Sequence, residues 1–311
     1  ISQQFDSFKS LEETQQEPIR LALRSSALGE DSESASFAGQ YSSELNVGRE
    51  GLLDAYKQVL ASKFSVTGMS YRLQMGIPEQ NVEMCVGCLS MVDAVAGGVI
   101  YTRNPLDIRD DSIFINAVLG LPKGVVDGRI ETDVFVVVGS GDDAKIQATP
   151  SKKSGKYVLN EGEGVRLLHF DSEDVESPCI DDSVVLSLAD MGRKLDSFFG
   201  QPQDVEWAID AKGKIILLQC RPLQLDEPPT HKALEKTITP KHDARCLATG
   251  HTASSGAGYG PVVVVSKQAD ALSFPEGGVL VAMQALPQWA PLLSRASAMI
   301  TVQGSIAGHL A

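Results

Sequence analysis

The sequence predicts an α+β fold, and three observations support this. Most of the chain consists of short strand-like segments separated by glycine-containing turns. Strong helical spacing of apolar residues occurs in residues 50–64 and 182–199. Residues 203–209 and 214–222 read as two strands joined by the turn "DAKG", which is typical of an antiparallel hairpin.

The N-terminal half predicts the following elements in order. Residues 24–40, "RSSALGEDSESASFAGQ", follow neither helical nor strand spacing and are typical of a surface loop. Residues 50–64 predict a helix, and residues 82–101 predict strands with a turn at Ala96–Gly98. Residues 110–120 predict a short strand that is buried on both faces and ends in a glycine turn.

Further strands and a long helix follow. Residues 129–139 and 145–151 predict neighbouring strands. The helix from about Asp182 to Phe199 can be capped by Asp181 or Asp182 and closed by Gly200. We expect one apolar stripe along it, formed by Val184, Leu188, Met191, Leu195 and Phe198.

The character of the chain changes after Arg221. Residues 223–243 are rich in Pro, Lys and Glu, lack periodicity and predict a linker. A second small unit follows from residue 244, with buried strands expected at residues 261–266, 277–282 and 296–302. With 311 residues, of which 43% are hydrophobic, the chain has the length and apolar content for about two domains.

Charge and composition exclude several classes of protein. A net charge of −13 without a stripe of Lys and Arg argues against nucleic-acid binding. No apolar run is as long as a membrane span, and no signal peptide opens the chain. Five cysteines without framework spacing predict a reduced, cytoplasmic protein. Cys85 and Cys88 form a CxxC in a strand-like segment, where they would point to opposite faces, so we interpret them as core cysteines rather than metal ligands.

Both ends of the sequence suggest a longer polypeptide. The chain starts at Ile1 rather than at a methionine, and it stops at "SIAGHLA" without a helix terminator or a tail. We therefore expect it to be part of a larger protein.

The hairpin of residues 203–222 carries the clearest chemical signal. Gln219 and Arg221 are two residues apart on one strand and share a face. If the turn contains an even number of residues, Glu206 on the first strand points to the same side. A carboxylate, an amide oxygen and a guanidinium would then converge, as a magnesium–nucleotide site requires. A solvated hairpin with an incidental ion pair is the alternative.

Four blocks of the sequence resemble the phosphoenolpyruvate synthase and pyruvate phosphate dikinase family, in the same order. They are "LALRSSALGEDSESASFAGQYSSELNV", "GGVIYTRNP", "INAVLGLPKGVVDGRIETDVFVV" and "QPQDVEWAIDAKGKIILLQCRP". They cover most of residues 18–222, and residues 277–311 resemble the start of the family's swivelling phosphohistidine domain. The resemblance implies an ATP-grasp domain in residues 1–222 that is incomplete at its N-terminus, a linker at 223–243, and a partial phosphohistidine domain in residues 244–311.

The resemblance also implies roles for individual residues. Arg24 and Arg221 match the arginines that bind the nucleotide phosphates, and Glu206 and Gln219 match the ligands of Mg-ATP. Residues 31–39, "DSESASFAG", match a mobile lid over the triphosphate, in which small residues such as Ser36 and Gly39 let backbone N–H groups approach oxygens.

Two further residues follow from the same blocks. Arg103 in "TRNP" either contacts the ligand or stabilises its own turn. His309 stands at the phosphocarrier position, where a neutral imidazole nitrogen can accept a phosphoryl group. The Thr and Ser that usually precede this histidine are absent, and Lys123 stands where relatives generally have an acidic residue.

The implied activity is that of an ATP-dependent phosphotransferase of the pyruvate, water dikinase type. ATP, Mg²⁺ and pyruvate or phosphoenolpyruvate are the expected cofactors and partners, and a homo-oligomer stays open. We expect the isolated chain to be inactive, because the family's nucleotide-binding lysine and its pyruvate-binding barrel are missing from it. The alternatives are a relative with another phosphoryl acceptor and a nucleotide-binding regulatory protein with a decayed transfer centre.

Overall fold

The structure is a computed structural model that describes most of the chain. The described residues are 19–28, 31–32, 35–36, 41–74, 76–78, 82–107, 109–170, 176–223, 245–250, 252–254, 256–267, 270–271, 273–284, 289–293 and 295–303. The predicted linker, apart from Leu223, lies outside these residues. The limits of the proposed domains therefore stay a prediction.

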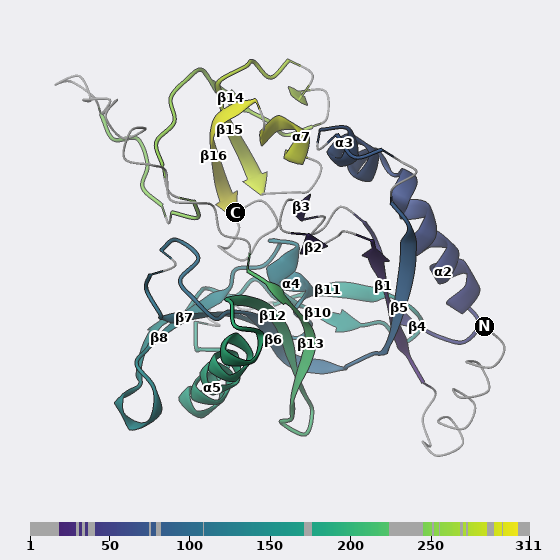
Figure 1. Ribbon diagram of the computed structural model, residues 1–311, viewed down its shortest axis with the longest axis vertical. Helices are drawn as coiled ribbons and strands as arrows, with labels where there is room; N and C mark the ends of the chain where they lie inside the picture. The colour runs from purple at the N-terminus through teal and green to yellow at the C-terminus, as the bar shows by residue number, and fades with distance from the viewer. Residues whose placement is uncertain are drawn as a thin grey trace.

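A six-stranded antiparallel sheet forms the centre of the molecule (Figure 1). Its strands lie in the order β13-β12-β6-β7-β8-β9. Their bounds are β6 Ala94–Tyr101, β7 Ile113–Leu119, β8 Asp133–Val138, β9 Lys145–Thr149, β12 Gln203–Asp210 and β13 Ile215–Pro222. The strands predicted from residues 110–120, 129–139, 145–151 and 203–222 are thus confirmed.

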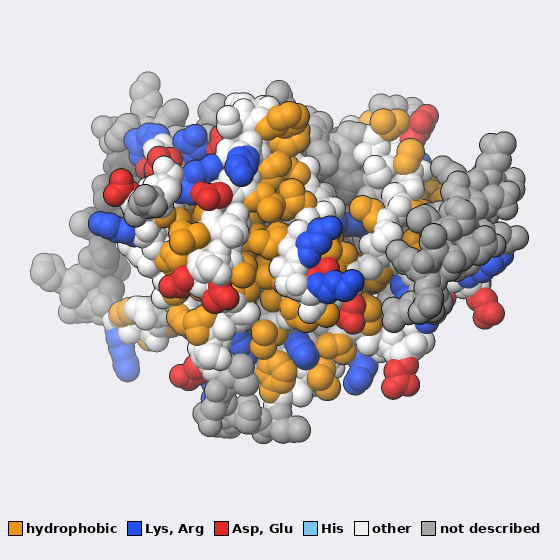
Figure 2. Space-filling view, turned by 90° about the horizontal axis from the view of Figure 1, so that it is seen from below, with side chains coloured by type: hydrophobic (Ala, Val, Ile, Leu, Met, Phe, Trp, Pro, Cys, Tyr) orange, Lys and Arg blue, Asp and Glu red, His pale blue; other side chains and the backbone are white. Residues whose placement is uncertain are grey.

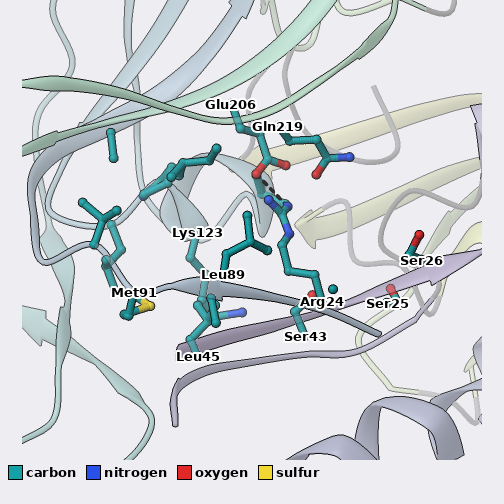
Figure 3. A pocket seen from close by; sticks show the side chains of 18 of the residues that line it. Arg24, Ser25, Ser26, Ser43, Leu45, Leu89, Met91, Lys123, Glu206 and Gln219 are labelled. Carbon is teal, nitrogen blue, oxygen red and sulfur yellow. Dashed lines mark hydrogen bonds and ion pairs between the residues drawn. The ribbon is translucent and has the colours of Figure 1, made fainter. Parts of the chain in front are cut away.

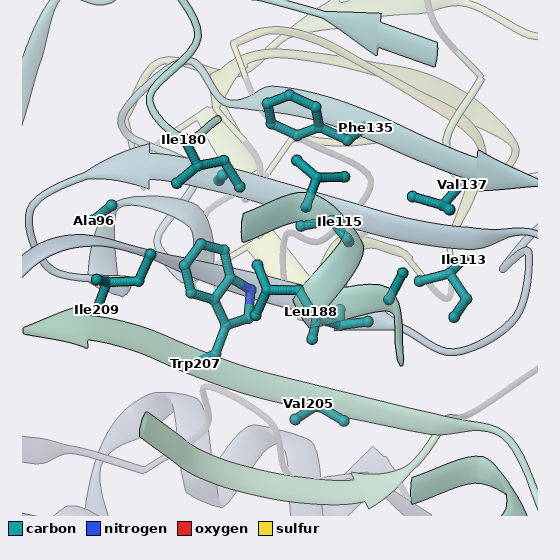
Figure 4. Packing of buried hydrophobic residues seen from close by; sticks show 14 residues of the cluster. Ala96, Ile113, Ile115, Phe135, Val137, Ile180, Leu188, Val205, Trp207 and Ile209 are labelled. Carbon is teal, nitrogen blue, oxygen red and sulfur yellow. The ribbon is translucent and has the colours of Figure 1, made fainter. Parts of the chain in front are cut away.

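Helix α5 (Asp182–Phe199) covers one face of this sheet (Figure 4). Its predicted ends are confirmed, because Asp181 accepts a hydrogen bond from the Val184 backbone N–H and Gly200 adopts a left-handed conformation with φ 69°. Leu188 of the helix and Trp207 of β12 are fully buried between them.

The predicted stripe of α5 is wrong in part. The buried residues of the helix are Val185, Leu188, Ala189 and Gly192, whereas Phe198 is 81% exposed. Small residues let the helix approach the sheet closely, since a Cβ on Gly192 would meet Ile100 at 3.3 Å. The contact face is therefore set by small residues as well as by large apolar ones.

The opposite face of the sheet packs on helix α4 (Lys123–Val126) and on a hairpin of β10 (Gly155–Leu159) and β11 (Val165–His169). Gly97 and Gly98 lie inside β6 and do not form the turn predicted at Ala96–Gly98, which is wrong. A side chain on Gly98 would collide with the carbonyl oxygen of Asn116 on β7, so the glycine serves close strand packing.

A second, three-stranded antiparallel sheet lies beside the first, in the order β4-β1-β5 (Figure 1). Its strands are β1 Leu21–Ala27, β4 Ser43–Val47 and β5 Met84–Ser90. Helix α2 (Leu52–Ala61) packs on this small sheet and leads through a 3₁₀ turn, η1 (Ser62–Phe64), to helix α3 (Val66–Gln74). The helix predicted at residues 50–64 is confirmed.

The segment predicted as a loop from residue 24 begins within a strand. Arg24 to Ala27 belong to β1, where they pair with β5 on one side and Arg24 also pairs with Ser43 of β4 on the other. Further along, the two-residue strands β2 (Asp31–Ser32) and β3 (Ala35–Ser36) pair with each other in antiparallel orientation. The polar residues of this segment lack the apolar alternation that predicts a strand. Their pairing partner β5 comes much later in the chain, so no local pattern indicates the pairing.

Asn46 ties the small sheet to the β10–β11 hairpin. It adopts a positive φ of 56°, in a conformation that Asn tolerates better than most residues. Its side-chain amide donates to the carbonyl oxygens of Asn160, Gly162 and Gly164 at 2.9–3.0 Å. These hydrogen bonds join β4 of the small sheet to the β10–β11 hairpin, which packs on the large sheet.

A buried ion pair lies at the start of β8. Lys153 Nζ donates to Asp133 Oδ1 at 2.7 Å, and their side chains are only 2% and 0% exposed. The same carboxylate accepts hydrogen bonds from the backbone N–H groups of Ser151 and Cys179, both at 2.7 Å. Two chain segments, residues 151–153 and Cys179, are thereby bound to the carboxylate of β8.

The C-terminal unit contains three parallel strands in the order β14-β15-β16, together with the short helix α7 (Ala290–Leu293). The strands are β14 Val262–Val264, β15 Gly278–Gln284 and β16 Ala296–Gln303. The predicted strands are confirmed, but the prediction that all are buried is wrong. Val262 and Val302 are 68% and 70% exposed, since only one face of this sheet packs on the core around Phe274.

On the face of the molecule seen from below, Lys and Arg are scattered among acidic and hydrophobic side chains and do not form a stripe (Figure 2). Within the described part of the chain, no helix combines the length and apolar character needed to cross a bilayer.

Candidate functional site

The β12–β13 hairpin brings the predicted ligand residues to one face. Glu206 pairs directly with Gln219, and Asp204 pairs with Arg221, so these four side chains share a face of the sheet. Val205, Trp207 and Ile209 belong to the core on the α5 side, so the acidic residues of β12 point away from it. The predicted convergence of Glu206, Gln219 and Arg221 is confirmed.

The reason for the convergence differs from the predicted one. Near the turn, Ile209 pairs with Ile215, which leaves an odd number of residues between them. The register then shifts between Glu206 and Trp207, because β13 carries an extra residue, Leu218, opposite them. This β-bulge, and not an even-numbered turn, places Gln219 on the side of Glu206.

This face of the hairpin borders a cavity of about 1000 Å³ between the large and the small sheet. The size is at the upper end of what ligand pockets show. Arg24, Ser25 and Ser43 line the cavity from the small sheet, while Glu206 and Gln219 line it from the large sheet (Figure 3). We refer to this cavity as the cleft.

An ion pair spans the cleft. Arg24 Nη2 on β1 donates to Glu206 Oε2 on β12 at 2.7 Å, with side chains 28% and 16% exposed (Figure 3). These residues are 182 positions apart in the chain. Arg24 and Glu206 therefore neutralise each other across the two sheets.

A second ion pair lies beside it on the hairpin. Arg221 donates through Nε and Nη2 to Asp204 Oδ2 at 2.9 and 2.6 Å. Burial raises the pKa of the neighbouring Tyr101 phenol, and the charge of Asp204 raises it further while that of Arg221 lowers it. The Tyr101 phenol therefore stays protonated and uncharged next to this pair.

Another part of the cleft is apolar and contains one further cation. Leu45, Leu89 and Met91 line it together with Lys123 (Figure 3). Lys123 Nζ lies 2.9 Å from Asp127 Oδ2, one helical turn along α4. Such a surface suits a flat, weakly polar ring, with a cation next to it.

Burial raises the pKa of the Glu44 carboxyl, and the charge of Lys123 opposes this rise. Glu44 is on β4, directly between Ser43 and Leu45 of the cleft wall. Lys123 therefore acts electrostatically on the small sheet as well as on its own helix.

Arg103 is not among the described residues that line the cleft. Its Nε donates to Asp196 Oδ2 of α5 at 3.2 Å, and the neighbouring Thr102 Oγ1 donates to the same oxygen. This contact joins the segment after β6 to α5, and the choice between a ligand contact and a turn-stabilising role for Arg103 stays a prediction.

Three predicted site residues cannot be placed. Gly39 and His309 lie outside the described residues. Ser36 belongs to strand β3, but only its backbone is described. Their roles stay predictions.

Asp204 is not among the site residues predicted from the sequence. Alternation along β12 could have found it, because residues 204 and 206 of a strand share a face. Asp204 is the ion-pair partner of Arg221. The prediction named only Glu206 as an acidic neighbour of that arginine. The cleft thus contains the Arg24–Glu206 pair and is lined by Arg221, whose partner Asp204 is not among the described lining residues.

Cys85 and Cys88 both lie on β5, which confirms the strand, but both are exposed, so their assignment to the core is wrong. β5 is an edge strand of the small sheet, and its side chains are therefore covered on fewer sides. Among the described residues, no three side chains of His, Cys, Asp or Glu gather as a metal cluster.

Comparison with known proteins places this geometry in context. Residues 2–242 match the family described as "Pyruvate phosphate dikinase, AMP/ATP-binding domain". The chain is 32% identical over 305 residues to a phosphoenolpyruvate synthase of Pyrococcus furiosus, covering 95% of this chain and 37% of that protein. It is 33% identical over 301 residues to a probable phosphoenolpyruvate synthase of Pyrococcus horikoshii, covering 94% and 36%.

A similar match extends to bacteria. The chain is 30% identical over 305 residues to the phosphoenolpyruvate synthase of Pseudomonas aeruginosa, covering 94% of this chain and 38% of that protein. The chain thus spans less than two fifths of the length of these curated relatives.

Proposed function

The chain belongs to the family of the pyruvate phosphate dikinase AMP/ATP-binding domain, and from this premise we propose that its cleft binds ATP for phosphoryl transfer. The chain would be the nucleotide-binding part of a phosphotransferase similar to phosphoenolpyruvate synthase. The observation that carries the proposal is the meeting of Arg24, Glu206, Gln219 and Arg221 at one cavity between two sheets.

The donor set of the cleft fits Mg²⁺. Glu206 and Gln219 offer a carboxylate and an amide oxygen from directly paired positions of β12 and β13. Magnesium is usually held by one or two protein groups, with substrate phosphates and water completing its shell. When bound, it would supply charge neutralisation at the phosphate oxygens.

The arginines provide the remaining positive charge. Arg24 and Arg221 have planar guanidinium groups that can hold phosphate oxygens through two hydrogen bonds. In the proposed reaction, a neutral nitrogen of His309 attacks phosphorus, and the bond from phosphorus to the leaving oxygen of the nucleotide breaks. The arginines orient the phosphates and stabilise the charge that spreads over their oxygens.

The rest of the proposed cycle depends on the longer protein. The ATP-grasp assignment of residues 1–222, the lid around Ser36 and Gly39, and the passage of the phosphoryl group from His309 to pyruvate follow from the family resemblance. The linker at residues 223–243 would let the C-terminal unit move between the ATP site of the cleft and the pyruvate site of the longer protein.

The test is labelling of the full-length gene product with ATP that carries radioactive phosphoryl groups. We expect an acid-labile phosphate on the protein that is lost in His309→Ala. The same variant should keep nucleotide binding, because it changes none of the residues proposed to hold ATP. Labelling that survives His309→Ala would contradict the phosphohistidine step.

A nucleotide-binding regulatory protein is the second candidate. Lys123 lines the cleft where relatives generally carry an acidic residue, and this favours altered nucleotide handling. Nucleotide binding without any labelling of His309 would support this candidate over the enzyme.

A further inference from the structure

The cleft neutralises its own charges. Arg24 pairs with Glu206, and Arg221 pairs with Asp204, so each cation faces one carboxylate at 2.6–2.9 Å. All four side chains are half-buried, between 11% and 28% exposed, which strengthens these contacts compared with surface pairs. Gln219, which pairs with Glu206 on the hairpin, is uncharged.

This pairing disfavours each ligand when it comes alone. A divalent cation that approaches Glu206 meets the guanidinium of Arg24 already bound to the same carboxylate. A triphosphate that approaches Arg24 or Arg221 meets two carboxylates that repel it. Either ligand alone would break a charge-assisted hydrogen bond and leave one charge without a partner, which is costly in a half-buried site.

The two ligands together avoid this cost. With both present, Arg24 exchanges its carboxylate for phosphate oxygens and Glu206 exchanges its arginine for the metal, while Asp204 keeps Arg221 as its partner. Arg24 and Glu206 then each have a partner of opposite sign before and after the exchange. We propose that Mg²⁺ and the triphosphate are admitted to the cleft only as a pair, by this exchange of ion-pair partners.

The inference rests on the proposed ATP binding and adds an order to it. The coupling is reciprocal, since a metal that raises the affinity for the nucleotide is itself bound more tightly by the same factor. Arg24 is the group that decides it. Its backbone belongs to the small sheet, while the carboxylate it covers belongs to the large sheet, so the side chain can change partners without disturbing either strand.

Binding of Mn²⁺, measured by its electron paramagnetic resonance signal, tests the inference. We expect the wild-type protein to show no saturable binding of Mn²⁺ alone, and saturable binding of a premixed complex of Mn²⁺ with a non-hydrolysable ATP analogue. We expect Arg24→Gln to bind Mn²⁺ alone in a saturable manner, with a dissociation constant at least tenfold below the highest Mn²⁺ concentration at which the wild type shows no saturation. The double variant Arg24→Gln/Glu206→Gln should lose this gain, because the uncovered carboxylate is what attracts the metal.

Arg109→Gln is the matched control. Arg109 also pairs with a carboxylate, that of Asp107 at 2.8 Å, but on an exposed loop. Its loss changes the net charge equally and should leave binding of Mn²⁺ alone unchanged.

The outcomes separate the two proposals. If the wild type does not bind the premixed complex, the proposed function fails, and the inference fails with it. If the wild type binds both the complex and Mn²⁺ alone with equal affinity, or if Arg24→Gln gains no affinity for Mn²⁺, only the inference is overturned. The wild-type comparison decides even if Arg24→Gln does not fold.

Discussion

The cleft and the start of β8 each contain a cation–carboxylate contact of 2.7 Å, Arg24 with Glu206 and Lys153 with Asp133. The surroundings of these two pairs differ. The Lys153–Asp133 side chains are 2% and 0% exposed, whereas those of Arg24 and Glu206 are 28% and 16% exposed. Water and ligands can reach the pair in the cleft but not the pair at β8.

The number of hydrogen bonds differs as well. Asp133 accepts further bonds from Ser151 and Cys179, so its carboxylate is held by two other chain segments, residues 151–153 and Cys179. Glu206 is held through the end of one long side chain. The comparison teaches that one pair is built to stay in place and the other to change partners.

The largest expected effect is therefore on stability at β8. Asp133→Asn removes the charge opposite the buried Lys153 ammonium, and we expect a loss of about 3–5 kcal/mol in the free energy of unfolding. Urea denaturation, followed by circular dichroism, measures this loss. Asp107→Asn, on the exposed pair with Arg109, is the control and should leave the free energy of unfolding nearly unchanged. Equal losses in both variants would contradict the distinction.

The second expected effect is on acid stability. Burial raises the pKa of Asp133, but hydrogen bonds from Lys153, Ser151 and Cys179 outweigh this, and the pKa lies below its ordinary value of 3.8. A carboxyl with a lowered folded-state pKa stabilises the fold above its unfolded-state pKa, and this contribution is lost as the pH falls through the folded-state pKa. We expect the free energy of unfolding to fall more steeply below about pH 4 in the wild type than in Asp133→Asn. Parallel curves would show that Asp133 does not carry this acid sensitivity.

The smallest expected effect on stability is in the cleft. Glu206→Gln keeps the shape of the side chain but leaves Arg24 without its charged partner in a half-buried site, so we expect a loss of about 1–2 kcal/mol in the free energy of unfolding, smaller than at the fully buried pair. Urea denaturation with the same protocol measures it. A loss as large as that of Asp133→Asn would mean that the cleft pair also holds the two sheets together.

Local signals allowed much of the fold to be predicted from the sequence. The ends of α5 follow from Asp181 and Gly200, which act within one turn of the helix. The buried stripe of α5 does not follow from apolar residues alone. Gly192 belongs to it because a residue without a side chain lets the helix approach the sheet closely. Gly98 misled the prediction in the same way, since a glycine that permits close packing and a glycine that permits a turn look alike in a sequence.

The candidate site was predictable where its residues share a strand or a hairpin. Gln219 and Arg221 are two residues apart, and Asp204 could have been added to Glu206 by the same alternation. The contact of Arg24 with Glu206 depends on how two sheets pack across 182 positions of sequence. The family resemblance implied that Arg24 and Glu206 share a ligand, and no local pattern indicated that they bind each other.

The extra residue Leu218 has a consequence for how the chain tolerates changes of length. Deleting this single residue would remove the bulge but leave Gln219 opposite Glu206 and Arg221 opposite Asp204, so both side chains would keep their orientation. Deleting Cys220 instead would bring Arg221 opposite Val205 and turn its guanidinium toward the apolar layer beneath α5. β13 can therefore be shortened at the bulge, whereas a shortening beyond it would misdirect a charged group.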